Sequence, residues 1–129
     1  MEINNNSHKH LANILLAHGS RDDTWRKPFE ELLEKCKRKS PKKHFCLCYL
    51  ELCEPKLEDV VKILLENNTN ISTIKIHPMF LSAGVHVNKD IQEILSNLKK
   101  TYPKINFFLN EVIGKKDVVT NAIYEAVSK

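Results

Sequence analysis

Two histidines stand beside glycines in this sequence, and their imidazole side chains could bind a metal ion. His18 directly precedes Gly19, and His86 follows Gly84 by two positions. Neutral imidazole is a ligand that suits Co, Ni, Fe and Zn. Glycine is used where the backbone takes a positive φ or lets a ligand approach closely. We expect the two imidazoles to share one divalent ion and to leave positions open for a substrate. A purely structural role in tight turns is the alternative.

A carboxylate follows another apolar segment of the chain. Glu51 comes at the end of a predicted strand and is expected to act as a metal ligand or as a proton acceptor. A salt-bridge partner is the alternative for this residue. His77, which precedes Pro78 at a second predicted strand end, is a weaker candidate for the same site, and His44 is expected to be structural.

Strands and helices alternate along the sequence, and their order predicts where these side chains lie. Short apolar runs are typical of strands buried on both faces, and apolar residues at three- and four-residue spacing indicate helices. Predicted strands are residues 11–17, 44–50, 73–77 and 105–109, and helical spacing covers residues 25–36, 57–65, 87–98 and 118–127. Pro55 is expected in the first turn of the second helix. The pattern predicts an α/β fold, a single βαβαβαβα lobe with a mostly parallel four-stranded sheet flanked by helices.

The loops after the strands are expected to hold the functional residues. In open α/β sheets, ligands bind beyond the carboxyl ends of the strands. These loops are residues 18–24, 51–55, 78–86 and 110–116. They contain His18, Glu51 and His86, together with the chain's three glycines. The topology therefore predicts that the candidate residues meet at one edge of the sheet.

Length and composition indicate one globular domain. The chain has 129 residues, of which 42% are hydrophobic and 28% charged. No apolar run approaches the roughly 20 residues of a membrane helix, and the polar start lacks a signal-peptide core. We expect a cytoplasmic protein with a flexible N-terminus at residues 1–10, including His8 and His10, and one domain at residues 11–129. The four cysteines lack zinc-site spacing and are expected to be small buried thiols.

The formal net charge is +4, and much of the excess lies in one stretch of the chain. This stretch contains Lys35, Lys37, Arg38, Lys39, Lys42 and Lys43. A solvated helix end is one interpretation, because cations complement the helix dipole there. Steering of a polyanionic partner is the other. Aromatic residues do not interleave with the basic run and no phosphate-binding loop is present, so neither a nucleic-acid partner nor a nucleotide cofactor is expected.

Three motifs resemble those of the small CbiX/SirB-type chelatases. They are His18-Gly19-Ser20-Arg21-Asp22 with Trp25 and Pro28-Phe29, Tyr49-Leu50-Glu51 with Pro55, and Pro78-Met79-Phe80-Leu81-Ser82-Ala83-Gly84-Val85-His86 with Asp90-Ile91. The match runs in order from about residue 13 to residue 127. The first and third motifs together are fairly specific, whereas either alone would be weak.

The resemblance implies a class II chelatase fold and insertion of a divalent metal into sirohydrochlorin. Co²⁺, for cobalamin synthesis, is the expected metal; Fe²⁺ for sirohaem and Ni²⁺ for coenzyme F430 are alternatives. A carrier that binds metal or tetrapyrrole without catalysis is another. Larger members hold the tetrapyrrole between two lobes, so the resemblance implies a homodimer of this one-lobe chain. Relatives usually carry an aliphatic residue at the position of His77, which could add a ligand or change metal preference.

The resemblance also assigns roles to residues. His18 and His86 match the metal-binding and catalytic histidines, and Glu51 matches the acidic residue near the site. The substrate-binding candidates are Ser20, Arg21, Ser82 and Gly84. Ser20 and the backbone N–H groups near residue 24 are expected to bind an anion at a helix start. Arg21 is a candidate clamp for a substrate carboxylate, and a salt bridge to Asp22 or Asp23 is its alternative.

Overall fold

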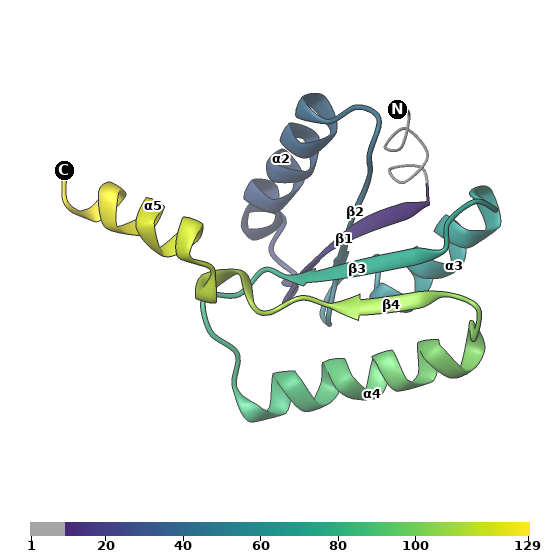
Figure 1. Ribbon diagram of the computed structural model, residues 1–129. Helices are drawn as coiled ribbons and strands as arrows, with labels where there is room; N and C mark the ends of the chain where they lie inside the picture. The colour runs from purple at the N-terminus through teal and green to yellow at the C-terminus, as the bar shows by residue number, and fades with distance from the viewer. Residues whose placement is uncertain (1–9) are drawn as a thin grey trace.

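The computed structural model describes residues 10–129 and confirms the predicted alternation of strands and helices (Figure 1). The elements are β1 (Leu11–Ala17), α2 (Asp23–Lys39), β2 (His44–Tyr49), α3 (Leu57–Asn67), β3 (Thr73–Pro78), α4 (Val85–Thr101), β4 (Asn106–Leu109), a short 3-10 helix η1 (Ile113–Lys115) and α5 (Asp117–Val127). Most of the expected segment 1–10 lies outside the described residues, and so does His8. His10 is held in place, since its carbonyl accepts hydrogen bonds from the N–H groups of Ser72 and Thr73.

The four strands form one parallel sheet in the order β2-β1-β3-β4. In the central strand β1, Leu15 lies beside Leu47 of β2 on one side and beside His77 of β3 on the other. Because successive side chains of a strand point to opposite faces, Ile14 and Leu16 share one face and Leu15 and Ala17 share the other. The near-continuous apolar sequence of β1 follows from burial on both faces.

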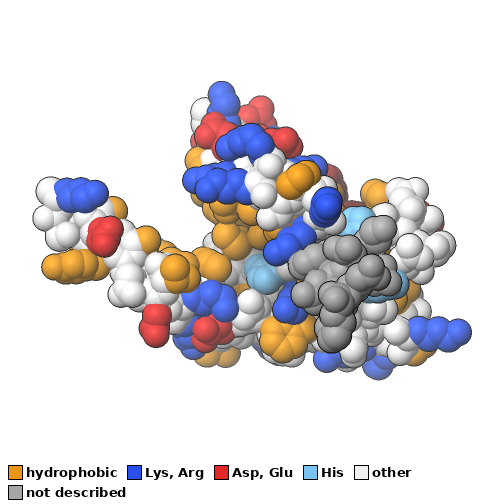
Figure 2. Space-filling view, turned by 45° about the horizontal axis from the view of Figure 1, so that its top comes forward, with side chains coloured by type: hydrophobic (Ala, Val, Ile, Leu, Met, Phe, Trp, Pro, Cys, Tyr) orange, Lys and Arg blue, Asp and Glu red, His pale blue; other side chains and the backbone are white. Residues whose placement is uncertain are grey.

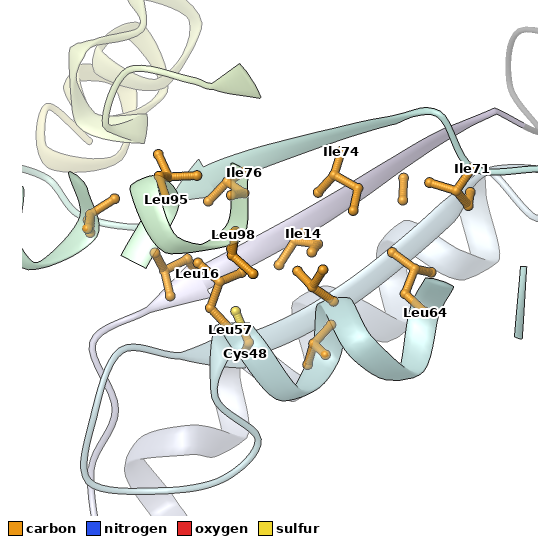
Figure 3. Close-up of a cluster of buried hydrophobic side chains, with 14 residues drawn as sticks. Ile14, Leu16, Cys48, Leu57, Leu64, Ile71, Ile74, Ile76, Leu95 and Leu98 are labelled. Atoms are coloured by element: carbon orange, nitrogen blue, oxygen red, sulfur yellow. The ribbon is translucent and has the colours of Figure 1, made fainter. Parts of the chain in front are cut away.

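Helices α3 and α4 cover the first face and form the larger core (Figure 3). Ile14, Ile76 and Leu57 are fully buried there, and Ile91 of α4 is 2% exposed. Cys48 belongs to the same core, where burial raises the pKa of its thiol. All four cysteines of the chain are free thiols.

Helix α2 covers the second face of the sheet over β1 and β2. Trp25 and Phe29 of α2 pack against the buried cluster that contains Leu15 and Tyr49. On β4 the Phe108 side chain remains 53% exposed, with the Lys75 ammonium 5.9 Å from its ring centre. One half of this sheet face is thus packed, and the half on β4 carries an exposed aromatic ring.

Helix α5 projects away from the rest of the molecule (Figure 1), and none of its residues is buried. Val118, Tyr124 and Val127 are 74%, 69% and 75% exposed. The space-filling view shows hydrophobic side chains along this helix, whereas charges of both signs gather over α2 (Figure 2). Among the helices of residues 10–129, none combines the length and apolar character needed to cross a bilayer.

Two sequence expectations for the helix starts are wrong. Pro55 precedes α3, because its carbonyl accepts a hydrogen bond from the Tyr49 N–H at 2.9 Å and Lys56 pairs with Tyr49 in a bridge that prolongs the sheet. The helix therefore starts only at Leu57. His86, expected in a loop, lies in the first turn of α4, which begins one residue earlier.

Candidate metal-binding and active site

His18 and Glu51 are brought together by two neighbouring strands. His18 directly follows β1 and Glu51 lies two residues beyond β2, at the carboxyl edge of the sheet. The parallel ladder continues past both strands, since the Leu50 N–H donates to the Ala17 carbonyl at 2.9 Å and the Glu51 N–H donates to the His18 carbonyl at 3.0 Å. The backbone itself therefore holds the two loops in register beneath the side chains.

Gly19 permits this close approach. Its φ of 105° lies in the left-handed region that favours glycine. A Cβ at this position would lie 1.8 Å from the Glu51 carbonyl oxygen, which is far inside any allowed contact. Both conformation and space therefore require glycine between His18 and the second loop.

The resulting side-chain pair is polar and accessible. His18 Nε2 lies 3.0 Å from Glu51 Oε2, and the two side chains are 40% and 53% exposed. The other ring nitrogen, Nδ1, faces the Gly19 carbonyl at 3.3 Å. A metal ion that binds Nε2 needs its lone pair, and must therefore replace the hydrogen bond to Glu51. A carboxylate so placed can bind the same ion or accept a proton from a nearby substrate.

The residue after Glu51 is strained. Leu52 has a φ of 71°, a left-handed conformation that bulky residues rarely adopt, and its side chain is 44% exposed. Such outliers cluster at functional sites, where the surrounding structure enforces them. Sequence reasoning missed this position because leucine carries no signal for a left-handed turn.

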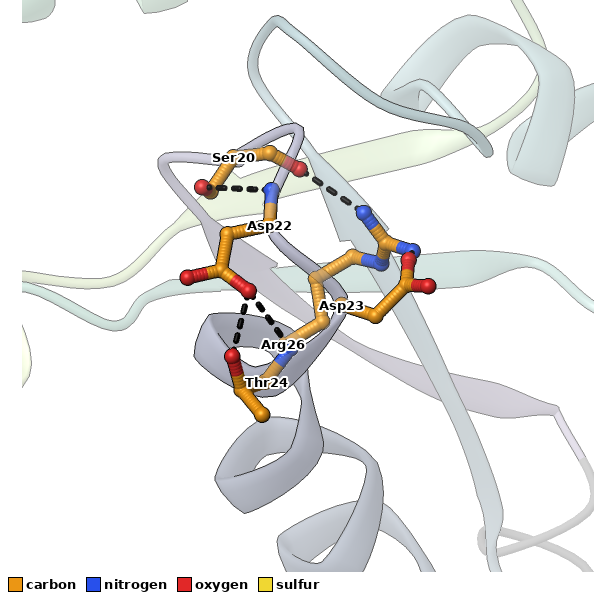
Figure 4. A network of polar contacts seen from close by, with 5 residues as sticks. All are labelled: Ser20, Asp22, Asp23, Thr24 and Arg26. Carbon is orange, nitrogen blue, oxygen red and sulfur yellow. Dashed lines mark hydrogen bonds and ion pairs between the residues drawn. The ribbon is translucent and has the colours of Figure 1, made fainter.

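The start of α2 is closed by its own residues (Figure 4). Asp22 caps the helix, since its carboxylate accepts hydrogen bonds from the Thr24 N–H at 2.9 Å and from the Thr24 hydroxyl. These bonds lower the pKa of Asp22 below its ordinary value. Arg26 donates to the Ser20 carbonyl at 2.8 Å and pairs with Asp23. The carboxylate of Asp22 therefore occupies the Thr24 N–H at this helix start, where we expected an external anion.

The same network defines what Ser20 and Arg21 can do. Ser20 Oγ accepts a hydrogen bond from the Asp22 N–H at 3.0 Å, which leaves its O–H free to donate. No ion pair joins Arg21 to Asp22 or Asp23, because these acids take Thr24 and Arg26 as partners. Arg21 is exposed beside the His18 loop. The salt-bridge alternative for Arg21 is therefore wrong.

The third motif forms the next part of the edge, after β3. Gly84 is the N-cap of α4 with no side-chain cap, and the first turn holds no acidic residue. Ser82 lines a cavity of about 450 Å³ together with Asn88, Glu111 and Lys115. His86 is exposed in this turn. Within residues 10–129, no three His, Cys, Asp or Glu side chains gather into a group that could hold a metal ion. The structure thus pairs His18 with Glu51 and leaves His86 separate from them.

His77 belongs to a different polar network. Its Nε2 lies 2.9 Å from Asn13 Oδ1 and its Nδ1 lies 3.2 Å from Asn110 Nδ2, while Lys116 Nζ donates to Asn110 Oδ1 at 3.2 Å. With both ring nitrogens in hydrogen bonds, His77 has no free lone pair for a metal. Burial, together with the charges of Lys75 and Lys116, lowers the pKa of His77. A lone asparagine, Asn13, in an apolar strand was the available sequence signal for this network.

Comparison with known proteins connects this geometry to one family. The family model CbiX matches residues 12–129. A sirohydrochlorin cobaltochelatase from Sulfolobus acidocaldarius is 28% identical over 116 residues, which cover 90% of this chain and 89% of that protein. A sirohydrochlorin ferrochelatase from Priestia megaterium is 24% identical over 92% of this chain, yet this match spans only 44% of the relative.

A solved structure gives the same result. The crystal structure of a cobalamin (vitamin B12) biosynthesis CbiX protein from Marinobacter aquaeolei matches with a TM-score of 0.79 and 31% identity. The match covers 92% of this chain and 94% of that one. The family model, the relatives and the fold agree over nearly the whole length, and the chain belongs to the CbiX family.

Proposed function

We propose that this protein inserts a divalent metal, with Co²⁺ as the expected ion, into sirohydrochlorin in tetrapyrrole (cobalamin) biosynthesis. The observation that carries the proposal is the pair of His18 Nε2 and Glu51 Oε2, 3.0 Å apart and open to solvent, in a CbiX chain. Cobalt is favoured because the relative named a cobaltochelatase is matched over 89% of its length. We infer that residues 11–129 form the working domain.

The reaction exchanges one divalent ion for two pyrrole N–H protons, so charge and atoms balance without a redox step. His18 binds the incoming ion through Nε2. His86, which lies apart from the His18–Glu51 pair within one chain, supplies a second imidazole in the two-chain site proposed below. As the ion leaves His18 for the macrocycle, Glu51 accepts one of the two displaced protons and solvent water accepts the other. No nucleotide takes part in this scheme, since it needs neither phosphoryl transfer nor hydride transfer.

The substrate's carboxylates are the groups that the surrounding residues would recognise. Sirohydrochlorin carries eight carboxylates. The Arg21 guanidinium and the free O–H of Ser20 can bind one of them beside His18. Ser82 and the uncapped N–H groups after Gly84 offer donors at the start of α4, where the helix dipole favours an anion.

A second copy of the chain would complete the site. One chain lacks a cluster of three metal-ligating side chains within residues 10–129 and spans 44% of the Priestia relative. A two-fold pair would bring two His18–Glu51 pairs to one cleft. The exposed hydrophobic side chains of α5 are the surface we assign to this homodimer. We place the dimer in the cytoplasm, where free thiols such as the four found here persist.

Spectroscopy of the tetrapyrrole tests the proposal. Purified protein with Co²⁺ is expected to change the absorption spectrum of sirohydrochlorin faster than the uncatalysed mixture. His18→Ala and His86→Ala should each remove most of that acceleration, because each deletes a metal-binding imidazole. His44→Ala, at the amino end of β2, is the matched control and should retain the rate. Full rates in both site variants would show that the site is misplaced. Tight binding of metal or tetrapyrrole without acceleration would indicate a carrier.

A further inference from the structure

A backbone contact joins η1 to the loop that carries the third motif. The Gly114 N–H donates to the Phe80 carbonyl at 3.0 Å. A Cβ at Gly114 would lie 2.1 Å from the Leu81 carbonyl oxygen and 2.5 Å from the Leu81 Cα. Unlike Gly19, Gly114 does not adopt a left-handed conformation. Lack of space against a neighbouring backbone is therefore what requires glycine at this position.

This contact supports the middle of residues 79–84, which we name the β3–α4 loop. At one end the Met79 N–H donates to the Leu16 carbonyl at 2.8 Å, and at the other Asn88 Nδ2 lies 3.5 Å from the Ala83 carbonyl. The Leu81 side chain is 69% exposed and adds little packing. The Phe80 side chain packs against the larger core, and the backbone of η1 supports the loop at the Phe80 carbonyl and at Leu81.

The β3–α4 loop leads directly into the turn that bears His86. Val87 in the first turn of α4 packs against the larger core, but the buried residues of the helix begin only at Ile91, more than a helical turn after His86. Val85, in the first turn, is 80% exposed. The position of this turn therefore depends on the contact of Val87 with the core and also on the loop before it, whose Leu81 backbone lies against Gly114.

We propose that Gly114 is a positioning residue for metal insertion, which holds the β3–α4 loop where His86 and Ser82 can act. The inference rests on the proposed function of that loop. A methyl group at residue 114 would have to displace the Leu81 backbone by roughly 1 Å, and a shift of that size at a reacting group can cost about 10²-fold in rate.

The test is Gly114→Ala, read by two measurements. We expect kcat/KM for Co²⁺ insertion to fall at least roughly tenfold. Zn²⁺ serves as a diamagnetic probe of the His86 ring by NMR, and its affinity should fall at least about fivefold for the same reason. Gly84→Ala is the matched control for stability, because a Cβ there meets nothing within 4 Å. Its thermal midpoint should fall by less than that of Gly114→Ala, because the change costs only the preference for glycine over alanine at an N-cap.

The outcomes separate this inference from the proposed function. Wild-type rates and Zn²⁺ affinity in Gly114→Ala would overturn the inference while leaving the function intact. A wild type that inserts no metal, but whose His86 ring responds to Zn²⁺ in a Gly114-dependent way, would overturn the function alone. Should the variant not fold, hydrogen exchange of the wild type decides. Zn²⁺ should slow exchange of the Gly114 amide, and unchanged exchange overturns the inference.

Discussion

The geometry of His18 and Glu51 is set by backbone more than by side-chain packing. Both side chains are about half-exposed, yet the hydrogen bond between the Glu51 N–H and the His18 carbonyl fixes their Cα atoms. Gly19 lets the two loops touch. An accessible pair on a rigid support suits the proposed site, which would have to release its metal, because neither side chain is held by its surroundings.

Removing the negative charge of Glu51 tests its role as proton acceptor. Glu51→Gln keeps the shape of the side chain but cannot accept a proton, so kcat for metal insertion should fall by about 10²-fold or more. Steady-state rates with sirohydrochlorin and Co²⁺ measure this effect. Glu54→Gln is the control in the same loop, since Glu54 pairs with Lys56 away from His18, and it should retain the rate. An equal decrease of kcat in both variants would attribute the effect to the negative charge of this loop and not to proton transfer by Glu51.

His77 gives stability a dependence on pH. Its pKa in the folded protein is lowered from 6.5, mainly by burial. As the pH falls, His77 therefore binds its proton at a higher pH in the unfolded chain than in the folded protein. The stabilising contribution of neutral His77 is complete above pH 6.5 and is lost below it, at no more than about 1.4 kcal/mol per pH unit.

Denaturant titrations between pH 7.5 and 5 check this expectation through the free energy of unfolding. His77→Leu removes the titrating ring and should flatten the decrease seen in the wild type. The control His44→Leu keeps His77 and should keep the decrease. An unchanged slope in His77→Leu would assign the pH dependence to other groups.

At the scale of elements, the helices differ in whether their N-terminal N–H groups already have a capping carboxylate. Asp22 caps α2 and Asp23 lies in its first turn. The positive end of the α2 dipole therefore already faces two carboxylates. Helix α4 has Gly84 as its N-cap, with no side-chain cap, and its first turn holds no acidic residue. Any substrate carboxylate that uses a helix dipole in this molecule will therefore find it at α4 and not at α2.

Helix α5 has an apolar stripe without a covering element in the described chain. Val118, Ala122, Ile123, Ala126 and Val127 recur at helical spacing along one side, and none is buried. An isolated helix of 11 residues is marginal in water. Packing against a second copy would supply the missing burial.

Charged substitutions on α5 test the homodimer. Val127→Asp and Ile123→Asp place a carboxylate in the apolar stripe and should shift the protein from dimer to monomer, by light scattering after gel filtration. Asn121→Asp adds the same charge on the opposite side of the helix and should remain dimeric. A wild type that is already monomeric at assay concentration would contradict the proposed assembly, whatever the variants do.

The sequence was sufficient for the order and type of the elements, and insufficient for contacts between loops. Apolar periodicity predicted β1, α2 and β3 because burial on known faces enforces it. The hydrogen bonds that extend the ladder to Glu51, and the fit of Gly114 against Leu81, arise from backbone approach, which has no periodic signal. The motifs indicated that His18, Glu51 and His86 matter, but only the fold separated the close pair from the lone histidine.

For the molecule as a whole, the open question that experiment can resolve is the metal. Parallel insertion rates for Co²⁺, Fe²⁺ and Ni²⁺ under anaerobic conditions should rank Co²⁺ first. Binding affinity alone is a poor guide, since the general order of divalent affinities is set by the ions more than by the site. A higher rate with Fe²⁺ would assign the reaction of the Priestia relative instead.

The projection of α5 also bears on stoichiometry. If two chains dimerise through this helix, they form one cleft on their two-fold axis, and this cleft contains two copies of each site residue. Sirohydrochlorin has no matching symmetry, so the pair would bind one macrocycle in either of two equivalent orientations. Titration should then saturate at half an equivalent per chain. A heterodimer of one wild-type and one His18→Ala subunit would keep one intact copy of His18. Its residual insertion rate would show whether one turnover needs one or both copies of this residue.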